Sequence, residues 1–137
     1  MVFTGHITDI DKVALFHLSR GIVFPSYLRA EAFGVTLLEG AMYGKPLIST
    51  EVGSGTSHVN IDQETGIVVP PGSAPALRGA MDELFANANR AKHMGARARE
   101  RFENLFTGEL MASRYTAIYN ELLNAAKSTD ESTAHRH

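Results

Sequence analysis

The sequence predicts an α/β fold in which a parallel β-sheet carries helices on both faces. Short apolar runs alternate along the chain with longer segments whose apolar residues recur every three or four positions. Most of the short runs contain Val or Ile with almost no polar alternation, as expected of parallel strands covered on both sides. This order of strands and helices predicts right-handed β-α-β units.

Four strands are predicted, at residues 2–4, 21–24, 46–50 and 66–69. The first helix follows Asp9 or Asp11, either of which can cap it. A second helix spans residues 35–43 and ends at Gly44, with Pro46 as a further stop signal. A third begins with Ser73 as its N-cap and Pro75 in its first turn.

Two more helices are predicted, at residues 90–104 and 107–126, the latter with an apolar stripe of Met111, Tyr115, Ile118 and Leu122. We expect residues 1–127 to form one partial domain and the polar residues 128–137 to be a disordered tail. The first predicted strand starts without a lead-in, which indicates a domain that is incomplete at its N-terminal end.

Composition excludes several classes of protein. The 137 residues suit one domain, and a net charge of -2 provides no polycation for nucleic acid. No apolar run approaches the ~20 residues that cross a bilayer, and no signal peptide is recognisable. The absence of cysteine excludes disulfides and agrees with a cytoplasmic location, which we predict.

Familiar catalytic motifs fail in detail. The stretch GAMYGKP has three residues between its glycines, not the four of a phosphate-binding P-loop, and Pro46 occupies the Ser or Thr position. In VGSGTS, Val52 replaces the first glycine of a nucleophile elbow. The histidines show no metal-ligand spacing, so we expect no metal; they include His6, His17, His58 and His93. The arginines and Lys92 of residues 90–101 read most simply as a solvated helix face, with a binding role as the alternative.

Two glutamates bracket the start of the second predicted helix. Glu31 lies in the loop after a strand, and Gly34 permits a close backbone approach at the first helical turn. That turn presents free N–H groups and the positive end of a helix dipole, which suit a diphosphate. Glu39 lies ~7–8 Å further along the helix axis, where it can accept hydrogen bonds from ribose hydroxyls.

Two other readings of these glutamates stay open. Glutamate is common in the first turns of helices because it complements the dipole, and it needs no function there. The pair also suggests a glycosidase, which requires carboxyl groups about 5–10 Å apart; the loop-plus-helix spacing makes this the weaker alternative.

A longer pattern carries a family resemblance. It consists of Pro25-Ser26, Glu31-Ala32-Phe33-Gly34, Glu39, Gly44-Lys45-Pro46, the loop Gly53 to Gly55, and Thr65-Gly66, and it continues through MGARARERFENLF. The sequence thereby resembles the C-terminal half of glycosyltransferase family 4. These are retaining enzymes of GT-B architecture that use nucleotide sugars, and the resemblance implies a Rossmann-like donor-binding domain.

The resemblance implies roles for individual residues. Glu31 would contact the donor sugar at the reacting centre, with a covalent nucleophile as the minority version of its role. Backbone amides around Phe33, Gly34, Val35 and Thr36 would hold the sugar hydroxyls and the diphosphate. Glu39 would hold the ribose. Gly5 and His6 resemble the segment beside the nucleobase, although a structural role for His6 is equally supported.

The resemblance also implies the reaction and the partners. The loop GSGTSHVN is closest to mannosyltransferase-like members that build surface polysaccharides, so GDP-mannose is the first expected donor. No cofactor or metal is expected beyond this nucleotide sugar. The acceptor-binding N-terminal domain is missing, so this chain alone is expected to be inactive and to self-associate through an exposed strand edge or its final helix. The alternative is a non-catalytic module that binds a nucleotide sugar or a protein.

Overall fold

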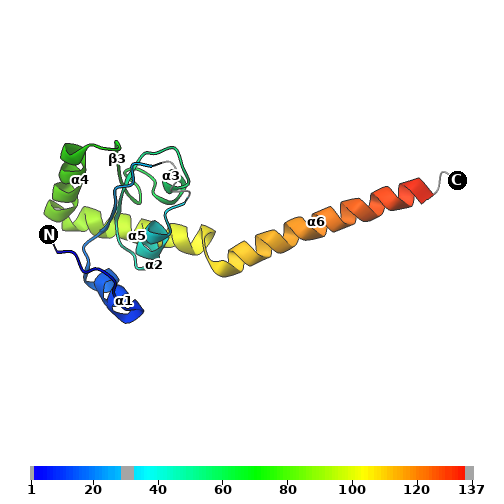
Figure 1. Ribbon diagram of the computed structural model, residues 1–137, viewed down its shortest axis with the longest axis horizontal. Helices are drawn as coiled ribbons and strands as arrows, with labels where there is room; N and C mark the ends of the chain where they lie inside the picture. Colours follow the sequence, from blue (N-terminus) through cyan, green and yellow to red (C-terminus); the bar gives the residue numbers. More distant parts are fainter. Residues whose placement is uncertain (1, 29–32, 135–137) are drawn as a thin grey trace. The chain divides into compact units, whose positions relative to one another are not determined.

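The computed structural model describes residues 2–28 and 33–134 (Figure 1). The chain divides into two compact units, Met1–Asn104 and Leu105–His137. The elements in chain order are α1 (Asp9–Leu18), β1 (Ile22–Phe24), α2 (Val35–Met42), β2 (Leu47–Thr50), α3 (Thr56–Val59), β3 (Gly66–Val69), α4 (Ala74–Ala86), α5 (Ala88–Leu105) and α6 (Gly108–Ala134).

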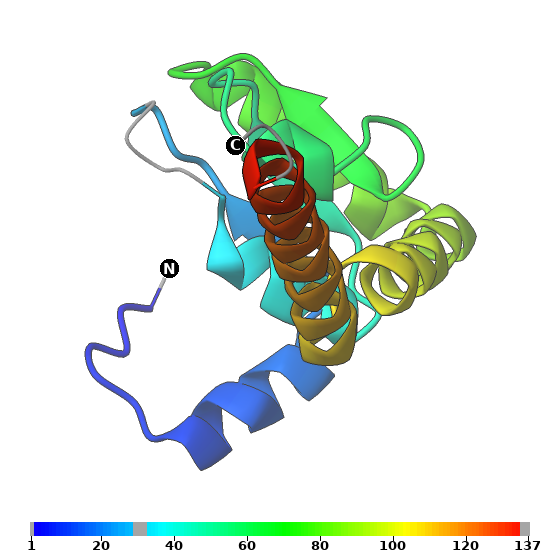
Figure 2. The same cartoon turned by 90° about the vertical axis from the view of Figure 1, so that its right-hand side faces the viewer.

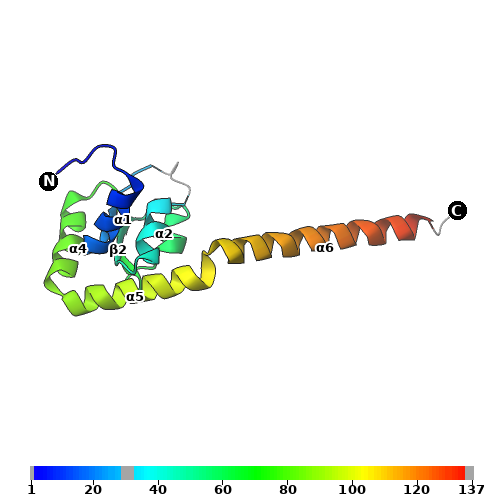
Figure 3. The same ribbon diagram turned by 90° about the horizontal axis from the view of Figure 1, so that it is seen from below.

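The three strands form a parallel sheet in the order β1-β2-β3. All four residues of the central strand β2 are buried, which explains its unbroken apolar and small-residue sequence. Figure 3 shows α4 and α2 on opposite sides of β2. The predicted α/β fold, with a parallel sheet and helices on both faces, is therefore confirmed.

Alternate residues of β2 face two different layers of the core. Ile48 packs in a cluster with β3, α4 and α5, whose other buried members are Ile67, Val69, Ala80, Leu84, Ala91 and Met94. Leu47 faces α2, where a methyl group built on Gly40 would lie 3.0 Å from its side chain. Gly40 therefore lets α2 lie close to the sheet.

A buried polar network joins β2, α3 and β3. The Asn60 amide donates to Ser49 Oγ at 2.8 Å and to the Ile67 carbonyl at 3.3 Å. The Thr65 hydroxyl donates to Asn60 Oδ1 at 3.0 Å. These three polar side chains are almost completely buried, and the network supplies the partners that burial requires. The sequence did not predict α3, which lies within the glycine-containing loop.

The predicted strand at residues 2–4 is wrong. Val2 and Phe3 are 86% and 85% exposed and lie in an irregular segment before α1. Their β-favouring composition is not enough, because a strand needs a neighbour to accept its backbone hydrogen bonds. Among the described residues, the sheet ends at β1 on this side.

The N-cap of α1 lies one residue before the first predicted cap, Asp9. Thr8 is its N-cap, and its hydroxyl accepts from the Asp11 amide. The helix joins the α2–β2 region through stacked Phe16 and Tyr43 rings, whose centroids lie 5.1 Å apart. Lys45 adds hydrogen bonds from its Nζ to the Ser19 carbonyl at 2.9 Å and the His17 carbonyl at 2.8 Å. Figure 2 shows α1 (blue) and the segment leading into it.

The basic residues of α5 make contacts within the domain. Arg97 pairs with Glu64 at 2.8 Å, and Arg101 donates two hydrogen bonds to the His58 carbonyl. Arg99 reaches both Glu103 and the Met42 carbonyl. These contacts fasten α5 to the α2–β2 and α3–β3 regions, so the arginines act as structural ties.

The second unit contains α6, which is longer than the sequence predicted. The helix begins at Gly108 and continues to Ala134, past residue 126, and so includes residues 128–134 of the expected tail. The first unit ends at Asn104. Every described side chain from Met111 to Ala125 is exposed.

Candidate functional site

The carboxyl ends of the three parallel strands define one edge of the sheet. Pro25 follows β1, Thr50 ends β2, and Pro70 follows β3. A pocket of about 240 Å³ lies at this edge, between these residues and the start of α4. Ligands of open parallel sheets bind outside this edge, which makes it the natural place to look for a site.

The N-terminus of α2 lies in the connection that leaves this edge. Gly34 is the N-cap and has φ 74° and ψ 64°, a left-handed conformation that favours glycine. Among residues 2–28 and 33–134, no side chain caps the helix, and the first amides of a helix have no acceptor within it. The α2 N-terminus therefore offers backbone N–H groups and a positive dipole end to an anion.

Four predicted donor-binding residues come together at this turn. Phe33, Gly34, Val35 and Thr36 are consecutive, and the side chains of Phe33 and Val35 are 38% and 65% exposed. Gly34 itself is buried, and a methyl group built there would lie 3.1 Å from Leu37 and 3.2 Å from Thr56. The contact with Thr56 places α3 against the same turn. Glu31, the predicted catalytic residue, lies outside the described residues.

Glu39 lies further along α2 and faces α1. Its Oε1 accepts from Lys12 Nζ at 2.9 Å, and the side chain is 30% exposed. This hydrogen bond, together with the carboxylate charge, raises the pKa of Lys12. Both residues line a pocket of about 310 Å³ between α1 and α2, beside Phe16 and Tyr43.

Lys12 is a site residue that sequence reasoning missed. Its helix was predicted, but a single lysine on an amphipathic helix does not reveal which carboxylate it will meet. Gly5 and His6 lie in the exposed segment just before that helix, and Gly5 has φ 63°. His6 is exposed and is therefore not a core histidine. Its predicted position beside the nucleobase remains a prediction.

Glu51 organises the loop that follows β2 and was also missed. Its carboxylate accepts from the Gly53 amide at 2.8 Å and from the Ser57 hydroxyl at 2.7 Å. The Ser57 hydroxyl, followed by the Gly53 N–H, holds the pKa of Glu51 below its usual value. The sequence signal for this role was a glutamate directly after a buried strand, with Gly53 and Ser54 two and three residues later.

The arrangement can bind an extended anionic ligand through backbone groups, with Glu39 available to hydroxyl groups. In residues 2–28 and 33–134, no three His, Asp or Glu side chains cluster closely enough to hold a metal ion. Within the same part of the chain, no helix has the length and apolar character of a membrane span.

Known proteins with similar sequences are sugar transferases. The chain is 50% identical over 125 residues to the O-antigen chain mannosyltransferase C of Escherichia coli, matching 91% of this chain and 34% of that protein. It is 56% identical over 105 residues to the D-rhamnosyltransferase WbpZ of Pseudomonas aeruginosa, matching 77% of this chain and 28% of that protein. The chain thus spans about a third of the length of these curated relatives.

The fold has a solved counterpart. Sucrose-phosphate synthase from Thermosynechococcus elongatus superposes with a TM-score of 0.78 at 34% identity, covering 90% of this chain and 30% of that structure. The sheet and its helices match part of the C-terminal domain of the GT-B architecture. The pattern of the family described as "Glycosyl transferases group 1" matches residues 1–101. The chain therefore belongs to the group 1 glycosyltransferases, as a partial C-terminal domain.

Proposed function

We propose that this chain is the donor-binding part of a retaining glycosyltransferase. The parent enzyme moves a sugar from a nucleotide sugar to a saccharide or lipid-linked acceptor during cytoplasmic steps of surface polysaccharide synthesis. The observation that carries this proposal is the α2 N-terminus, with Gly34 in the left-handed conformation, in the connection that follows β1. The names of the two relatives agree with a sugar-transfer role.

The diphosphate is assigned to the α2 N-terminus. Amides of Val35 and Thr36 supply hydrogen-bond donors there, and the helix dipole favours the negative charge. The Thr56 side chain lies against Gly34 and helps to fix the position of this turn. The charge of a leaving diphosphate is stabilised without reorganisation, which is how such preorganised donors accelerate a reaction.

The ribose is assigned to Glu39. A carboxylate accepts two hydrogen bonds from vicinal hydroxyls, and Glu39 opens on the pocket between α1 and α2. Lys12 occupies one of its oxygens at 2.9 Å and fixes the position of the side chain. Gly5 and His6, in the segment before α1, are assigned to the nucleobase.

Glu31 is assigned to the donor sugar, beside the reacting carbon. In the proposed step, the bond from that carbon to the diphosphate oxygen breaks, and a bond to the acceptor oxygen forms on the same face. The acceptor proton passes to the leaving diphosphate, so the anomeric configuration is retained. Glu31 stabilises the positive charge that develops on the sugar ring.

GDP-mannose is the first candidate donor. The two relatives are named for mannose and rhamnose, and D-rhamnose is mannose without the 6-hydroxyl group. Both sugars share the axial 2-hydroxyl, so a site for either accepts the same ring shape. A comparison of GDP-mannose with GDP-D-rhamnose therefore tests whether the site has a partner for the 6-hydroxyl.

Thermal unfolding in the presence of nucleotides tests the proposal. We expect GDP-mannose to raise the melting temperature more than UDP-glucose does, and Glu39→Ala to abolish the shift. The matched control is Glu83→Ala, which also removes an ion-paired glutamate, here the partner of Arg90 at 3.0 Å outside the site, and should still respond to the donor. Loss of the response in both variants would make Glu39 a structural residue, and no response in the unchanged chain would contradict the donor-binding proposal.

A non-catalytic module is the second candidate function. This candidate concerns residues 1–137 by themselves, which span about a third of the curated relatives. We expect these residues, when purified by themselves, to bind a nucleotide sugar without transferring the sugar. Measurable release of GDP from GDP-mannose in the presence of a saccharide acceptor would contradict this expectation.

A further inference from the structure

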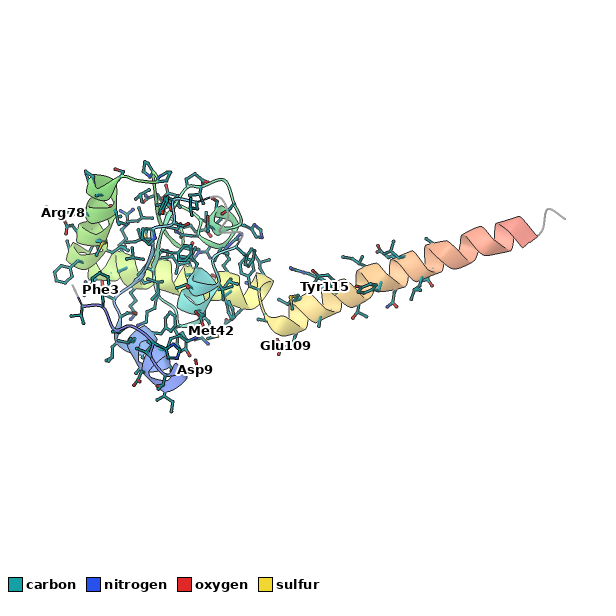
Figure 4. All side chains as sticks on the ribbon, in the orientation of Figure 1. Phe3, Asp9, Met42, Arg78, Glu109 and Tyr115 are labelled. Carbon is teal, nitrogen blue, oxygen red and sulfur yellow. The ribbon has the colours of Figure 1, made fainter. Side chains whose placement is uncertain are left out.

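Two threonines contact the connection between β1 and α2 near its start and at its end. Thr50, the last residue of β2, donates its hydroxyl hydrogen to the carbonyl of Ser26, which lies two residues after β1. Thr56 lies against Gly34, the N-cap of α2, with its methyl carbon 3.2 Å from a methyl group built on that glycine. In Figure 4, Met42 marks the last residue of α2, and the turn at Gly34 lies at the opposite end of this helix.

Both threonine side chains are buried in the first unit. Thr50 is 5% exposed and Thr56 is 1% exposed. A buried hydroxyl needs a hydrogen-bond partner, and the Ser26 carbonyl supplies it for Thr50. The Thr56 Oγ1 atom lies 3.2 Å from Ser54 Oγ, and the methyl group of Thr56 meets Gly34. The two threonines therefore act through different atoms, Thr50 through its hydroxyl and Thr56 through its methyl group.

Glu51 closes the loop that joins the two threonines. Its carboxylate accepts from the Gly53 amide at 2.8 Å and from the Ser57 hydroxyl at 2.7 Å, so one side chain joins residue 53 to residue 57. Gly53 has φ 65°, in the left-handed region that favours glycine, which suits a sharp turn at this position. Thr56 lies between these two hydrogen-bonded residues, so the closed loop restricts its position.

The far side of α3 is attached to other elements of the first unit. Arg101 of α5 donates to the His58 carbonyl at 3.1 and 2.6 Å. The Asn60 side-chain amide donates to Ser49 Oγ of β2 at 2.8 Å, and the Asn60 backbone N–H donates to the Thr56 carbonyl at 2.9 Å. Because α3 is held by both α5 and β2, Thr56 forms a fixed support for the α2 turn.

The α2 turn depends on such a support. Glycine is conformationally permissive, so Gly34 by itself does not restrict the backbone to one conformation. Its carbonyl accepts from the Leu37 amide at 2.8 Å and, at the longer distance of 3.4 Å, from the Leu38 amide. Within the part of the chain that the structure describes, no side chain caps this turn. The contact from Thr56 restricts the turn from outside the helix.

From these contacts, we infer that Thr50 and Thr56 are positioning residues for the diphosphate site at the α2 N-terminus. Thr50 acts through the Ser26 carbonyl and Thr56 acts through Gly34, so neither threonine has to touch the ligand. N–H donors that are already in position stabilise a negative charge without reorganisation, and loss of either support therefore weakens diphosphate binding. The identity of the ligand rests on the proposed function, whereas the support of the turn can be measured without a ligand.

Paired substitutions test each threonine by the atom that it uses. Thr50→Val removes the hydroxyl and keeps the shape of the side chain, whereas Thr50→Ser keeps the hydroxyl. At position 56 the order is reversed, since Thr56→Ser removes the methyl group that meets Gly34 and Thr56→Val keeps a methyl group there. In calorimetric titrations of the 137-residue chain, we expect Thr50→Val and Thr56→Ser each to raise the Kd for GDP by about fivefold. Thr50→Ser and Thr56→Val should stay within about twofold of the unchanged chain.

Guanosine is the control ligand, because it has the base and the ribose but no phosphate. Thr50→Val and Thr56→Ser should leave the Kd for guanosine unchanged, since the pocket that Glu39 lines lies between α1 and α2. An equal rise of the Kd for guanosine and for GDP would show a general loss of structure and would exclude a positioning role. Equal Kd values for GDP in all four variants would exclude it as well.

Hydrogen exchange measures the support of the turn without a ligand. The Leu37 amide donates to the Gly34 carbonyl at 2.8 Å, so its exchange rate reports on this turn. We expect this amide to exchange about fivefold faster in Thr50→Val and Thr56→Ser than in Thr50→Ser and Thr56→Val, with the amide of buried Ile48 as the unchanged reference. Equal Leu37 exchange in all four variants would overturn the inference. If the expected exchange pattern is found but the unchanged chain does not bind GDP, the proposed function fails and the support of the turn by the two threonines stands.

Discussion

Lys12 Nζ lies 2.9 Å from Glu39 Oε1, and this contact joins α1 to α2 across a pocket. The residues are 27 positions apart in the chain, so only the tertiary fold brings them together. The pair holds in place the carboxylate that we assign to the ribose. Its strength therefore affects both the attachment of α1 and the shape of the candidate site.

The stability that the Lys12–Glu39 pair contributes should depend on pH in the alkaline range. Glu39 raises the pKa of Lys12 above its ordinary value of 10.5, so the contribution is fully present below that pH and is lost as the pH rises through the raised pKa. We expect Lys12→Met to melt at a lower temperature than the unchanged chain at pH 8, with the difference vanishing well above pH 10.5. Lys92→Met, at an exposed lysine of α5, should show no such pH-dependent difference. A constant difference across the alkaline range would exclude the charge interaction as its cause.

Glu51 should make an opposite contribution at acid pH. Its pKa is held below the ordinary value of 4.5, so its stabilising contacts are fully present above that pH and are lost as the pH falls through the lowered pKa. Chemical unfolding should show that the unchanged chain loses more stability than Glu51→Gln between pH 5 and pH 3. Ser57→Ala removes the larger cause of the shift and should reduce this acid-dependent loss. If the unchanged chain and Glu51→Gln lose the same stability between pH 5 and pH 3, protonation of Glu51 does not contribute to the acid dependence of stability.

Gly34 allows a test of the α2 turn that separates backbone strain from a local clash. Gly34→Ala introduces a residue at φ 74° and also places a methyl group 3.1 Å from Leu37. We expect a loss of about 1–2 kcal/mol in stability and a marked loss of nucleotide binding. Gly72→Ala is the matched control, because φ is 73° there and the methyl group meets no described atom within 4 Å. Normal donor binding in Gly34→Ala would argue against a role of this turn in holding the diphosphate.

Gly95 is required where α5 crosses the α2–β2 connection. A methyl group at this position would lie 2.1 Å from the Gly44 carbonyl oxygen, so Gly95→Ala must push the backbones apart. We expect a loss of about 1–3 kcal/mol in unfolding free energy. In contrast, Gly79→Ala adds a methyl group that meets no described atom within 4 Å inside α4, and should stabilise by about 0.5–1 kcal/mol. Similar unfolding free energies for Gly95→Ala and Gly79→Ala would show that α5 can move away from Gly44 without a loss of stability.

Local sequence signals predicted most elements of the first unit. Residues 46–50 and 66–69 are unbroken runs without polar alternation, and both became buried strands. Ser73 and Pro75 carried the capping signal that begins α4. The failure at residues 2–4 has a physical cause, since β propensity does not by itself supply the neighbouring strand that a sheet requires.

By itself, the sequence determined the α/β alternation, the glycine turn at Gly34 and the apolar period of α6, because each depends on residues close together in the chain. Only the tertiary structure decided which charges meet. It paired Lys12 with Glu39, and it brought arginines of α5 to Glu64 and to the His58 carbonyl. Local preferences act over a few residues, whereas these contacts require segments that folding alone brings together.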